Sequence, residues 1–440
     1  MTMNESDFFN FRSAVFDELS EKLSRFTEEA DRDAAIRGAV KSVNLAATEE
    51  DIAAVIKDSK VFDPIDKYLY DPDVEDIMVN NTANIFLYTG TRGQMKAPEK
   101  IATRKELGML VKKLKMYVTN EGAGNRIFDI HLPMGSRVNV VDSPLGADIT
   151  IRNFKPQALS IIDLINKGEL NYAVAARLWL YVDGLKVRPA NLMIGGMPAS
   201  GKTTLLNAIF SFFRPEERIV LIEETYELNT ETQDNCVRLE TSTALDTQAL
   251  VKNSLRMRPD IIMIGEVRGE EAKDMMTAMN IGKISMATIH ASNARDVITR
   301  LQHTPMNIEK DIIPLIDAII MISQVEEGGK MVRKITQISE ISGIETQVLL
   351  SDLYLYDYKT HKNSNILPSV TYRDLLSKLT GYPPSEIIIE EQRRAKILEK
   401  LNQMGIHDLR GINQFCREYY YSPEAALEKI GLKELGTLPW

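Results

Sequence analysis

The chain has 440 residues, of which 44% are hydrophobic and 26% are charged, a balance typical of globular proteins rather than disordered or membrane-embedded ones. This length predicts two or three domains, each able to bury a core of its own. The net charge of -9 disfavours a protein that binds nucleic acid broadly, because polyanions are repelled on average.

Targeting and redox signals are few. The start of the chain, 1–16, carries Glu5 and Asp7 and no apolar run fit for a signal peptide, and no later run approaches the roughly 20 apolar residues that span a bilayer. Cys236 and Cys416 lie too far apart for a disulfide framework or a four-cysteine zinc site. We therefore expect a cytoplasmic protein in a reducing compartment.

The first part of the chain predicts a helical segment followed by a mixed domain. Residues 1–60 read as helical and acidic, without assignable chemistry. Residues 61–154 alternate short strand-like runs with turn signals around a helical stretch near 104–116, which predicts a compact α+β domain. Residues 155–185 predict a linker or hinge that leads into an apolar helix.

Residues 186–350 show a different pattern, in which apolar strand-like runs alternate with helical stretches. These runs are 191–194, 219–222, 261–264, 285–289 and 318–322. The alternation predicts a mostly parallel sheet with helices on both faces, as in α/β domains. Residues 351–440 turn helical and charged, with helix candidates at 385–404 and 408–421.

The strongest motif matches G-x-x-x-x-G-K-[ST] from Gly196 to Thr203, between an apolar run and a helical run. Glycines let backbone N–H groups wrap the phosphates, Lys202 supplies positive charge and the Thr203 hydroxyl coordinates Mg²⁺. A chance match is expected in about 1% of chains of this length. The predicted nucleotide-binding residues are Gly196, Pro198, Ala199, Ser200, Gly201, Lys202, Thr203 and Thr204.

Carboxylates follow two of the apolar runs. Glu223 and Glu224 come directly after one run, and Glu266 follows another through a glycine. Ligands of doubly wound sheets bind at the carboxyl edge of the strands, where one carboxylate can polarise the attacking water and another can hold Mg²⁺. Each strand end alone is compatible with an ordinary solvated surface. Two such ends beside a phosphate loop indicate a hydrolysis site.

Further candidates lie near the same edge. His290 ends another apolar run and is placed to contact the γ-phosphate, although a lone histidine is more often structural. Arg256, Arg258 and Arg268 flank the run 261–264 and are candidates for stabilising charge, or else a basic surface that balances nearby acids. The sequence leaves both alternatives open.

Taken in order, these motifs resemble the type II and type IV secretion ATPases, which carry a Walker A loop, an acidic box, a Walker B motif and a histidine box at similar spacing. The matching segments are Gly196–Thr203, Glu223–Glu227, Ile261–Glu266 and Gly282–His290. Phrases that include Arg137 and Arg152 resemble the N-terminal domain of that family, where such arginines approach the nucleotide at the domain cleft. The resemblance covers about residues 60–340.

Within the superfamily, residues 156–180 and the C-terminal helices look most like archaeal members, among them archaellum and pilus-assembly ATPases, and next like tight-adherence pilus ATPases. The resemblance implies an α/β fold with a RecA-like P-loop NTPase domain, a hinged N-terminal α+β domain and C-terminal helices. It also implies a homohexamer that hydrolyses ATP with Mg²⁺. Its partner would be a polytopic inner-membrane platform protein, which puts the motor at the cytoplasmic membrane, and no nucleic acid is expected.

The resemblance also implies roles for individual residues. Glu223 activates water, Glu266 is the Walker B carboxylate, and Arg137 or Arg152 closes the domains on the γ-phosphate, so that hydrolysis reopens the cleft and moves the membrane partner. The predicted catalytic residues are Glu223, Glu224, Glu266, Arg137, Arg152, Arg268 and His290. The predicted Mg²⁺ ligands are Thr203 and Glu266.

Three positions depart from the family pattern. Glu224 stands where relatives usually have Asp, and Lys283 stands where the histidine box begins with Gly-His, so only His290 carries over from that box. Met197 and Pro198 are unusual but occupy variable positions of the loop.

Two other function classes stay open on the sequence. A ring nucleic-acid translocase shares the RecA-like core, but its expected excess of basic residues is absent, since 62 Asp and Glu outnumber 53 Lys and Arg. An ATP-binding scaffold with little turnover is compatible with Glu224 and Lys283. Turnover with and without the candidate carboxylates separates the scaffold from the motor.

Overall fold

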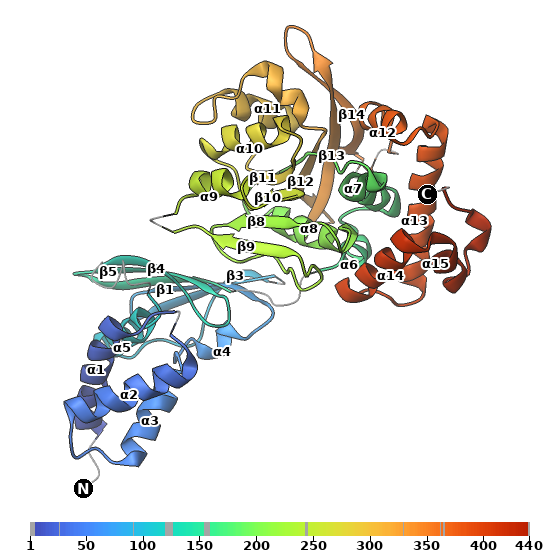
Figure 1. The fold of residues 1–440 in the computed structure, drawn as a ribbon. Helices are drawn as coiled ribbons and strands as arrows, with labels where there is room; N and C mark the ends of the chain where they lie inside the picture. Colours follow the sequence, from blue (N-terminus) through green and yellow to red (C-terminus); the bar gives the residue numbers. More distant parts are fainter. Residues whose placement is uncertain are drawn as a thin grey trace. The chain divides into compact units, whose positions relative to one another are not determined.

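The computed structural model describes residues 5–25, 27–90, 92–118, 126–153, 159–242, 245–328, 330–360, 362–363 and 366–438. The chain forms two compact units, residues 1–156 and 157–440 (Figure 1). The predicted domain end at Phe154 and the start of the predicted linker lie outside the described residues. The five-part division made from the sequence stays a prediction.

The first unit combines helices with an antiparallel sheet. Its helices are α1 (Glu5–Lys22), α2 (Glu29–Val43), α3 (Glu49–Ser59), α4 (Asp66–Leu69) and α5 (Arg104–Lys115). Its strands are β1 (Val74–Asn80), β2 (Asn84–Thr89), β3 (Gly93–Lys96), β4 (Ile127–His131), β5 (Arg137–Ser143) and β6 (Gly146–Arg152). The sheet order is β3-β2-β1-β6-β5-β4, with antiparallel neighbours. Helix α5 confirms the helical stretch predicted near 104–116.

The sheet of the first unit buries one face and leaves the other more open. Along β6, Ile149 and Ile151 are buried and Arg152 is exposed, because successive side chains of a strand point to opposite faces. The buried side chains join a core with helical residues such as Phe16 and Leu110. Arg137 lies directly opposite Arg152 in the register, so the two arginines share the open face.

The second unit alternates strands and helices around a larger sheet. Its helices are α6 (Ile161–Asn166), α7 (Tyr172–Asp183), α8 (Lys202–Ala208), α9 (Thr247–Ser254), α10 (Glu271–Asn280), α11 (Ala294–Gln302), α12 (Thr371–Thr380), α13 (Pro384–Gln403), α14 (Leu409–Tyr421) and α15 (Pro423–Lys429). Short 3-10 helices are η1 (Gly184–Lys186), η2 (Ile209–Phe212), η3 (Lys310–Leu315) and η4 (Lys433–Leu435). Its strands are β7 (Leu192–Gly195), β8 (Ile219–Glu223), β9 (Cys236–Glu240), β10 (Ile261–Ile264), β11 (Ile284–Ile289), β12 (Ala318–Glu327), β13 (Lys330–Ile344), β14 (Val348–Asp357) and β15 (Lys362–Asn363).

The sheet order in this unit is β15-β14-β13-β12-β7-β11-β10-β8-β9. Strands β9, β8, β10, β11, β7 and β12 run parallel, as predicted, whereas β13, β14 and β15 add antiparallel hairpins at one side. Residues 351–357, which the sequence analysis assigned to the helical C-terminal region, belong to β14. The reason is that residues up to Leu355 pair with β13, whereas Tyr356 and Asp357 pair with β15, and such pairing between strands outweighs local propensity.

Helices cover both faces of this sheet. Along β7, Leu192 and Ile194 contact the core shared with α6, α7, α8 and the C-terminal helices, while Met193 contacts the core of α9, α10 and α11. Figure 1 shows α9, α10 and α11 grouped on one side of the strands. A parallel sheet between two helical layers, with the phosphate-loop motif between β7 and α8, confirms the predicted RecA-like α/β fold.

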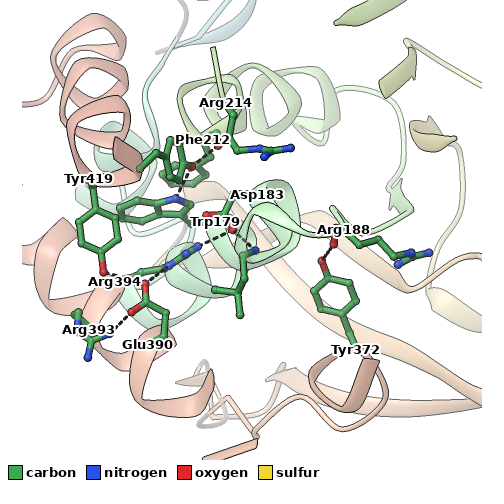
Figure 2. A network of polar contacts seen from close by, with 12 residues as sticks. Trp179, Asp183, Arg188, Phe212, Arg214, Tyr372, Glu390, Arg393, Arg394 and Tyr419 are labelled. Carbon is green, nitrogen blue, oxygen red and sulfur yellow. Dashed lines mark hydrogen bonds and ion pairs between the residues drawn. The ribbon is translucent and has the colours of Figure 1, made fainter. Parts of the chain in front are cut away.

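Buried charges join the C-terminal helices to the rest of this unit (Figure 2). Arg394 of α13 donates to Asp183 at the end of α7 over 2.8 Å and to Glu390 over 2.9 Å. The hydroxyl of Tyr419 on α14 donates to the same Glu390 oxygen over 2.9 Å. The guanidinium of Arg394 also lies 4.9 Å from the ring centroid of Trp179. We call Arg394, Asp183, Glu390 and Tyr419 the C-terminal network.

Among the described residues, no helix has the length and apolar character needed to cross a membrane.

Candidate nucleotide site

The phosphate-loop motif adopts a backbone that only particular residues tolerate. The chain leaves β7 at Gly195 and enters α8 at Lys202, with Gly201 in the left-handed region at φ 104°. A Cβ atom at Gly196 would lie 2.4 Å from the Ser200 hydroxyl oxygen, which is closer than real atoms approach. Glycine at both positions therefore lets the loop close on itself.

The polar groups of this loop fit a phosphate ligand. Lys202 Nζ donates to the carbonyl oxygens of Gly196 over 2.9 Å and Met197 over 3.2 Å. The Ser200 hydroxyl oxygen is buried and has no hydrogen-bond partner among the described residues. Burial lowers the pKa of Lys202, and the nearby carboxylate of Glu266 opposes this effect. A buried cation and an unpartnered hydroxyl in one loop are the groups that phosphate oxygens satisfy.

A chain of contacts runs from this loop across the sheet edge. Lys202 Nζ lies 3.2 Å from Nδ1 of His290, and His290 Nε2 lies 2.9 Å from Oε1 of Glu266. Arg268 Nε lies 3.2 Å from the same Glu266 oxygen, and its Nη2 donates to Oε2 of Glu224 over 2.5 Å. We call Lys202, His290, Glu266, Arg268 and Glu224 the edge network.

Strand pairing explains why these residues meet. Strand β11 lies between β7 and β10, and β8 follows β10, all in parallel register. His290 follows the end of β11 and Glu266 lies just past the end of β10, while Glu224 follows β8. Because carboxyl ends of parallel strands meet at one edge, residues far apart in sequence converge there.

Glu223 lies outside the edge network. Its side chain is 3% exposed, and its Oε1 accepts hydrogen bonds from the backbone N–H groups of Glu227 over 2.9 Å and Leu228 over 3.0 Å. Its Oε2 accepts from Arg238 over 3.3 Å. Burial raises the pKa of Glu223 to about 7, although these bonds favour the ionised form. In this structure the carboxylate therefore holds the acidic loop that follows β8.

The other predicted residues are placed as follows. Thr203 and Thr204 lie half-buried in the first turn of α8. Arg137 and Arg152 belong to the first unit, where Arg152 Nε lies 3.4 Å from Asp76 and Arg137 Nη2 lies 3.9 Å from Asp129. The approach of either arginine to a nucleotide remains a prediction.

Two residues that support the loop were missed by the sequence analysis. The Ala199 carbonyl accepts hydrogen bonds from Gln324 Nε2 over 3.1 Å and from Arg333 Nε over 3.2 Å. Both donors lie on the β12–β13 hairpin, more than a hundred residues from the loop, and no local motif marks them. The contact of Arg238 on β9 with Glu223 was missed as well, because no local motif indicates it.

Comparison with known proteins identifies a family for this chain and several relatives. The family model "Type II/IV secretion system protein" matches residues 59–347. An uncharacterized protein of Methanocaldococcus jannaschii is 30% identical over 377 residues, covering 80% of this chain and 66% of that protein. A probable conjugal transfer protein, TrbB of Sinorhizobium fredii, is 31% identical over 288 residues, covering 62% of this chain and 86% of that protein. The chain thus spans just under two thirds of the length of the first relative.

Among solved structures, the ATPase DotB of Legionella pneumophila is 18% identical and matches with a TM-score of 0.48, covering 75% of this chain and 86% of that one.

Proposed function

Since the chain belongs to the type II/IV secretion system protein family, we propose that it binds Mg²⁺ and ATP at the edge network and hydrolyses ATP to ADP and phosphate. The observation that carries this proposal is the contact path from Lys202 through His290 to Glu266. It joins the loop cation to the Walker B carboxylate through a single imidazole, so all three groups meet where the γ-phosphate of a bound nucleotide is expected.

The residues of the loop bind the phosphates in this proposal. Lys202 exchanges its carbonyl partners for phosphate oxygens, and the backbone of Gly196 to Gly201 wraps the phosphate chain. Thr203 and Glu266 would hold Mg²⁺ together with the nucleotide, and the ion would supply positive charge beside the transferred phosphoryl group. His290 contacts both Lys202 and Glu266, which suits it to respond when the γ-phosphate leaves.

Glu223 keeps the predicted role of the base that activates water. Its pKa of about 7 suits proton transfer near neutral pH. Its Oε2 is held by Arg238 over 3.3 Å, a long contact that an incoming water can replace. Arg268 lies between Glu224 and Glu266 and is the arginine nearest to the Walker B carboxylate by the contacts described above. Arg137 or Arg152 closes the two units on the γ-phosphate.

We propose further that the protein works as a homohexameric motor that powers archaellum-type or type IV pilus filament assembly, or protein secretion. Family membership supports a secretion or pilus role. In this proposal the motor is cytoplasmic and docks on a polytopic membrane platform protein at the cytoplasmic membrane.

The test is Mg²⁺-dependent phosphate release from ATP by the wild-type chain, Lys202→Ala and Glu266→Gln. Removal of either group is expected to lower turnover by at least about 100-fold, the loss usually seen when one preorganised charge is removed from an active site. Lys252→Ala and Glu270→Gln are matched controls, because both residues are exposed and pair with other side chains outside the edge network. The controls should keep turnover within about twofold of wild type.

Particle size is followed by light scattering when a non-hydrolysable ATP analogue is added. Ring-sized particles that form with the analogue support the motor. Tight ATP binding with negligible wild-type turnover would contradict the enzyme and support a scaffold instead.

A further inference from the structure

The P-loop contains one peptide that is both strained and held from outside the loop. Ala199 has φ 59°, in the left-handed region, which costs a residue with a Cβ atom roughly 1–2 kcal/mol. Its carbonyl accepts from both Gln324 and Arg333, which are direct cross-strand partners on β12 and β13. Two donors on one carbonyl fix the orientation of this peptide, so the hairpin compensates the local strain.

Arg333 also touches the start of α8. A Cβ atom at Gly201 would lie 3.2 Å from Arg333 Cδ, so the aliphatic stem of Arg333 covers this glycine. Gly201 directly precedes Lys202, the cation of the loop. One side chain therefore spans the loop from the strained peptide at Ala199 to the residue before the phosphate-binding lysine.

On its other side, the hairpin bonds to the backbone of Glu169, a residue whose buried carboxylate the proposed reaction does not use. Glu169 follows α6, is 6% exposed, and has its Oε2 buried with no hydrogen-bond partner among the described residues. Its backbone carbonyl accepts from the N–H of Ile335, two residues beyond Arg333 on β13, over 2.9 Å. Burial raises the pKa of Glu169, whereas the positive charges of Arg333 and Lys167 oppose that rise.

We propose that Arg333 is a positioning residue for ATP hydrolysis, which fixes the Ala199 peptide of the P-loop while its charge balances the buried Glu169. This inference rests on the proposed function. Arg333 then has two roles that can be tested separately: it positions the nucleotide-binding loop, and it stabilises the fold. Because α6 is the first helix after the segment that joins the two units, the hairpin also links the loop to the start of the second unit.

The two tasks are separated by comparing Arg333→Ala with the double variant Arg333→Ala/Glu169→Gln. In Arg333→Ala, the KM for ATP should rise about tenfold, the factor that corresponds to one lost hydrogen bond from a charged donor. The midpoint of urea unfolding should fall as well, because Glu169 loses a balancing charge. In the double variant, the unfolding midpoint should recover while the KM stays raised. Arg333→Lys, which keeps the charge, should keep the wild-type midpoint with an intermediate KM.

Met331→Ala is the matched control, because Met331 lies on the same hairpin and is exposed; it should leave both quantities unchanged. A wild-type KM in Arg333→Ala would overturn the inference. Recovery of both KM and midpoint in the double variant would also overturn it, since Arg333 would then act only through Glu169.

Failure of the proposed function is distinguishable from failure of the inference. If the wild-type chain releases no phosphate, the proposed ATPase is wrong, and binding of a fluorescent ATP analogue to the wild type and Arg333→Ala tests the positioning role directly. Weaker binding by Arg333→Ala supports that role, and equal binding overturns it.

Discussion

The second unit contains two groups of linked charges with opposite surroundings. In the edge network, the side chains of Glu266, His290 and Arg268 are 22%, 34% and 56% exposed. In the C-terminal network, the side chains of Arg394 and Asp183 are 0% exposed (Figure 2). Linked acids and bases thus lie both at a solvent-accessible edge and in the core between α7 and the C-terminal helices.

Burial decides what each of these two groups of charges can do. At the exposed edge, water screens each ion pair, so an individual contact contributes little and can exchange for a phosphate oxygen. In the core, removal of one partner leaves the other without compensation in a medium of low dielectric. The edge network is therefore suited to bind and release a ligand, and the C-terminal network is suited to hold two parts of the fold together.

The largest effect is expected from breaking the buried network. Arg394→Met leaves Asp183 buried without its cation and leaves Glu390 with Arg393 alone, so it should lower the free energy of unfolding by about 3–5 kcal/mol in urea titrations. Arg268→Met, the matched change at the edge, should cost less than about 1 kcal/mol. Equal losses in the two variants would contradict the comparison. Adding Asp183→Asn to Arg394→Met should restore much of the loss, because it removes the uncompensated carboxylate.

A nucleotide should stabilise the protein through the edge network alone. At 100 times its Kd, Mg²⁺-ATP is expected to raise the free energy of unfolding by about 2.7 kcal/mol, because it binds only the folded chain. The shift in thermal unfolding should disappear in Lys202→Ala and persist in Tyr419→Phe, whose change lies in the C-terminal network. A shift that survives Lys202→Ala would place the ligand elsewhere.

The pH dependence of stability tests the raised pKa of the buried Glu223 carboxyl group. Its pKa is raised by burial from 4.5 to about 7 in the folded chain, so the folded state holds this proton more tightly than the unfolded state. The resulting stability is fully present below pH 4.5 and is lost as the pH rises through about 7. Glu223→Gln cannot ionise, so its stability relative to wild type should increase between pH 5 and pH 8 by at most about 3 kcal/mol. A difference that stays constant with pH would refute this assignment.

The smallest effect is expected from removing one hydroxyl of the buried network. Tyr419→Phe deletes a donor to Glu390, which keeps its contacts with Arg393 and Arg394, and should cost about 1 kcal/mol in urea unfolding. Tyr421→Phe is the matched control, because that exposed hydroxyl bonds only to the surface residue Glu216 in the contacts described, and its loss should be smaller still. A larger loss in the control would contradict the role given to burial.

Much of the fold could be predicted where the sequence pattern is local. The run 261–264 matches β10 residue for residue, and the helix candidate at 408–421 matches α14 to within one residue. In contrast, β12 continues to Glu327, beyond the predicted end at 322, because it pairs with β13 along this extension. Hairpins of this kind depend on contacts between strands, and their alternating, half-polar sequences give a weak signal.

The candidate site also combines residues that local motifs could locate with contacts that only the fold could show. The phosphate loop and the carboxylates after β8 and β10 could be located from local motifs, because strand ends of a parallel sheet meet at one edge. The sequence could not show that Glu224 and Glu266 share Arg268 while Glu223 turns to backbone N–H groups. Neighbouring residues on a strand end point in opposite directions, and only the packed structure decides which carboxylate is buried.

The family, the parallel core and the position of the P-loop could be read from the sequence, because they follow from short motifs and from the spacing of apolar runs. Three features came only from the folded structure: the hydrogen bonds of Gln324 and Arg333 to the loop, the burial of the Glu169 carboxylate, and the burial of Arg394. These features depend on side chains brought together from distant parts of the chain. Their energies depend on burial, which a linear pattern does not specify.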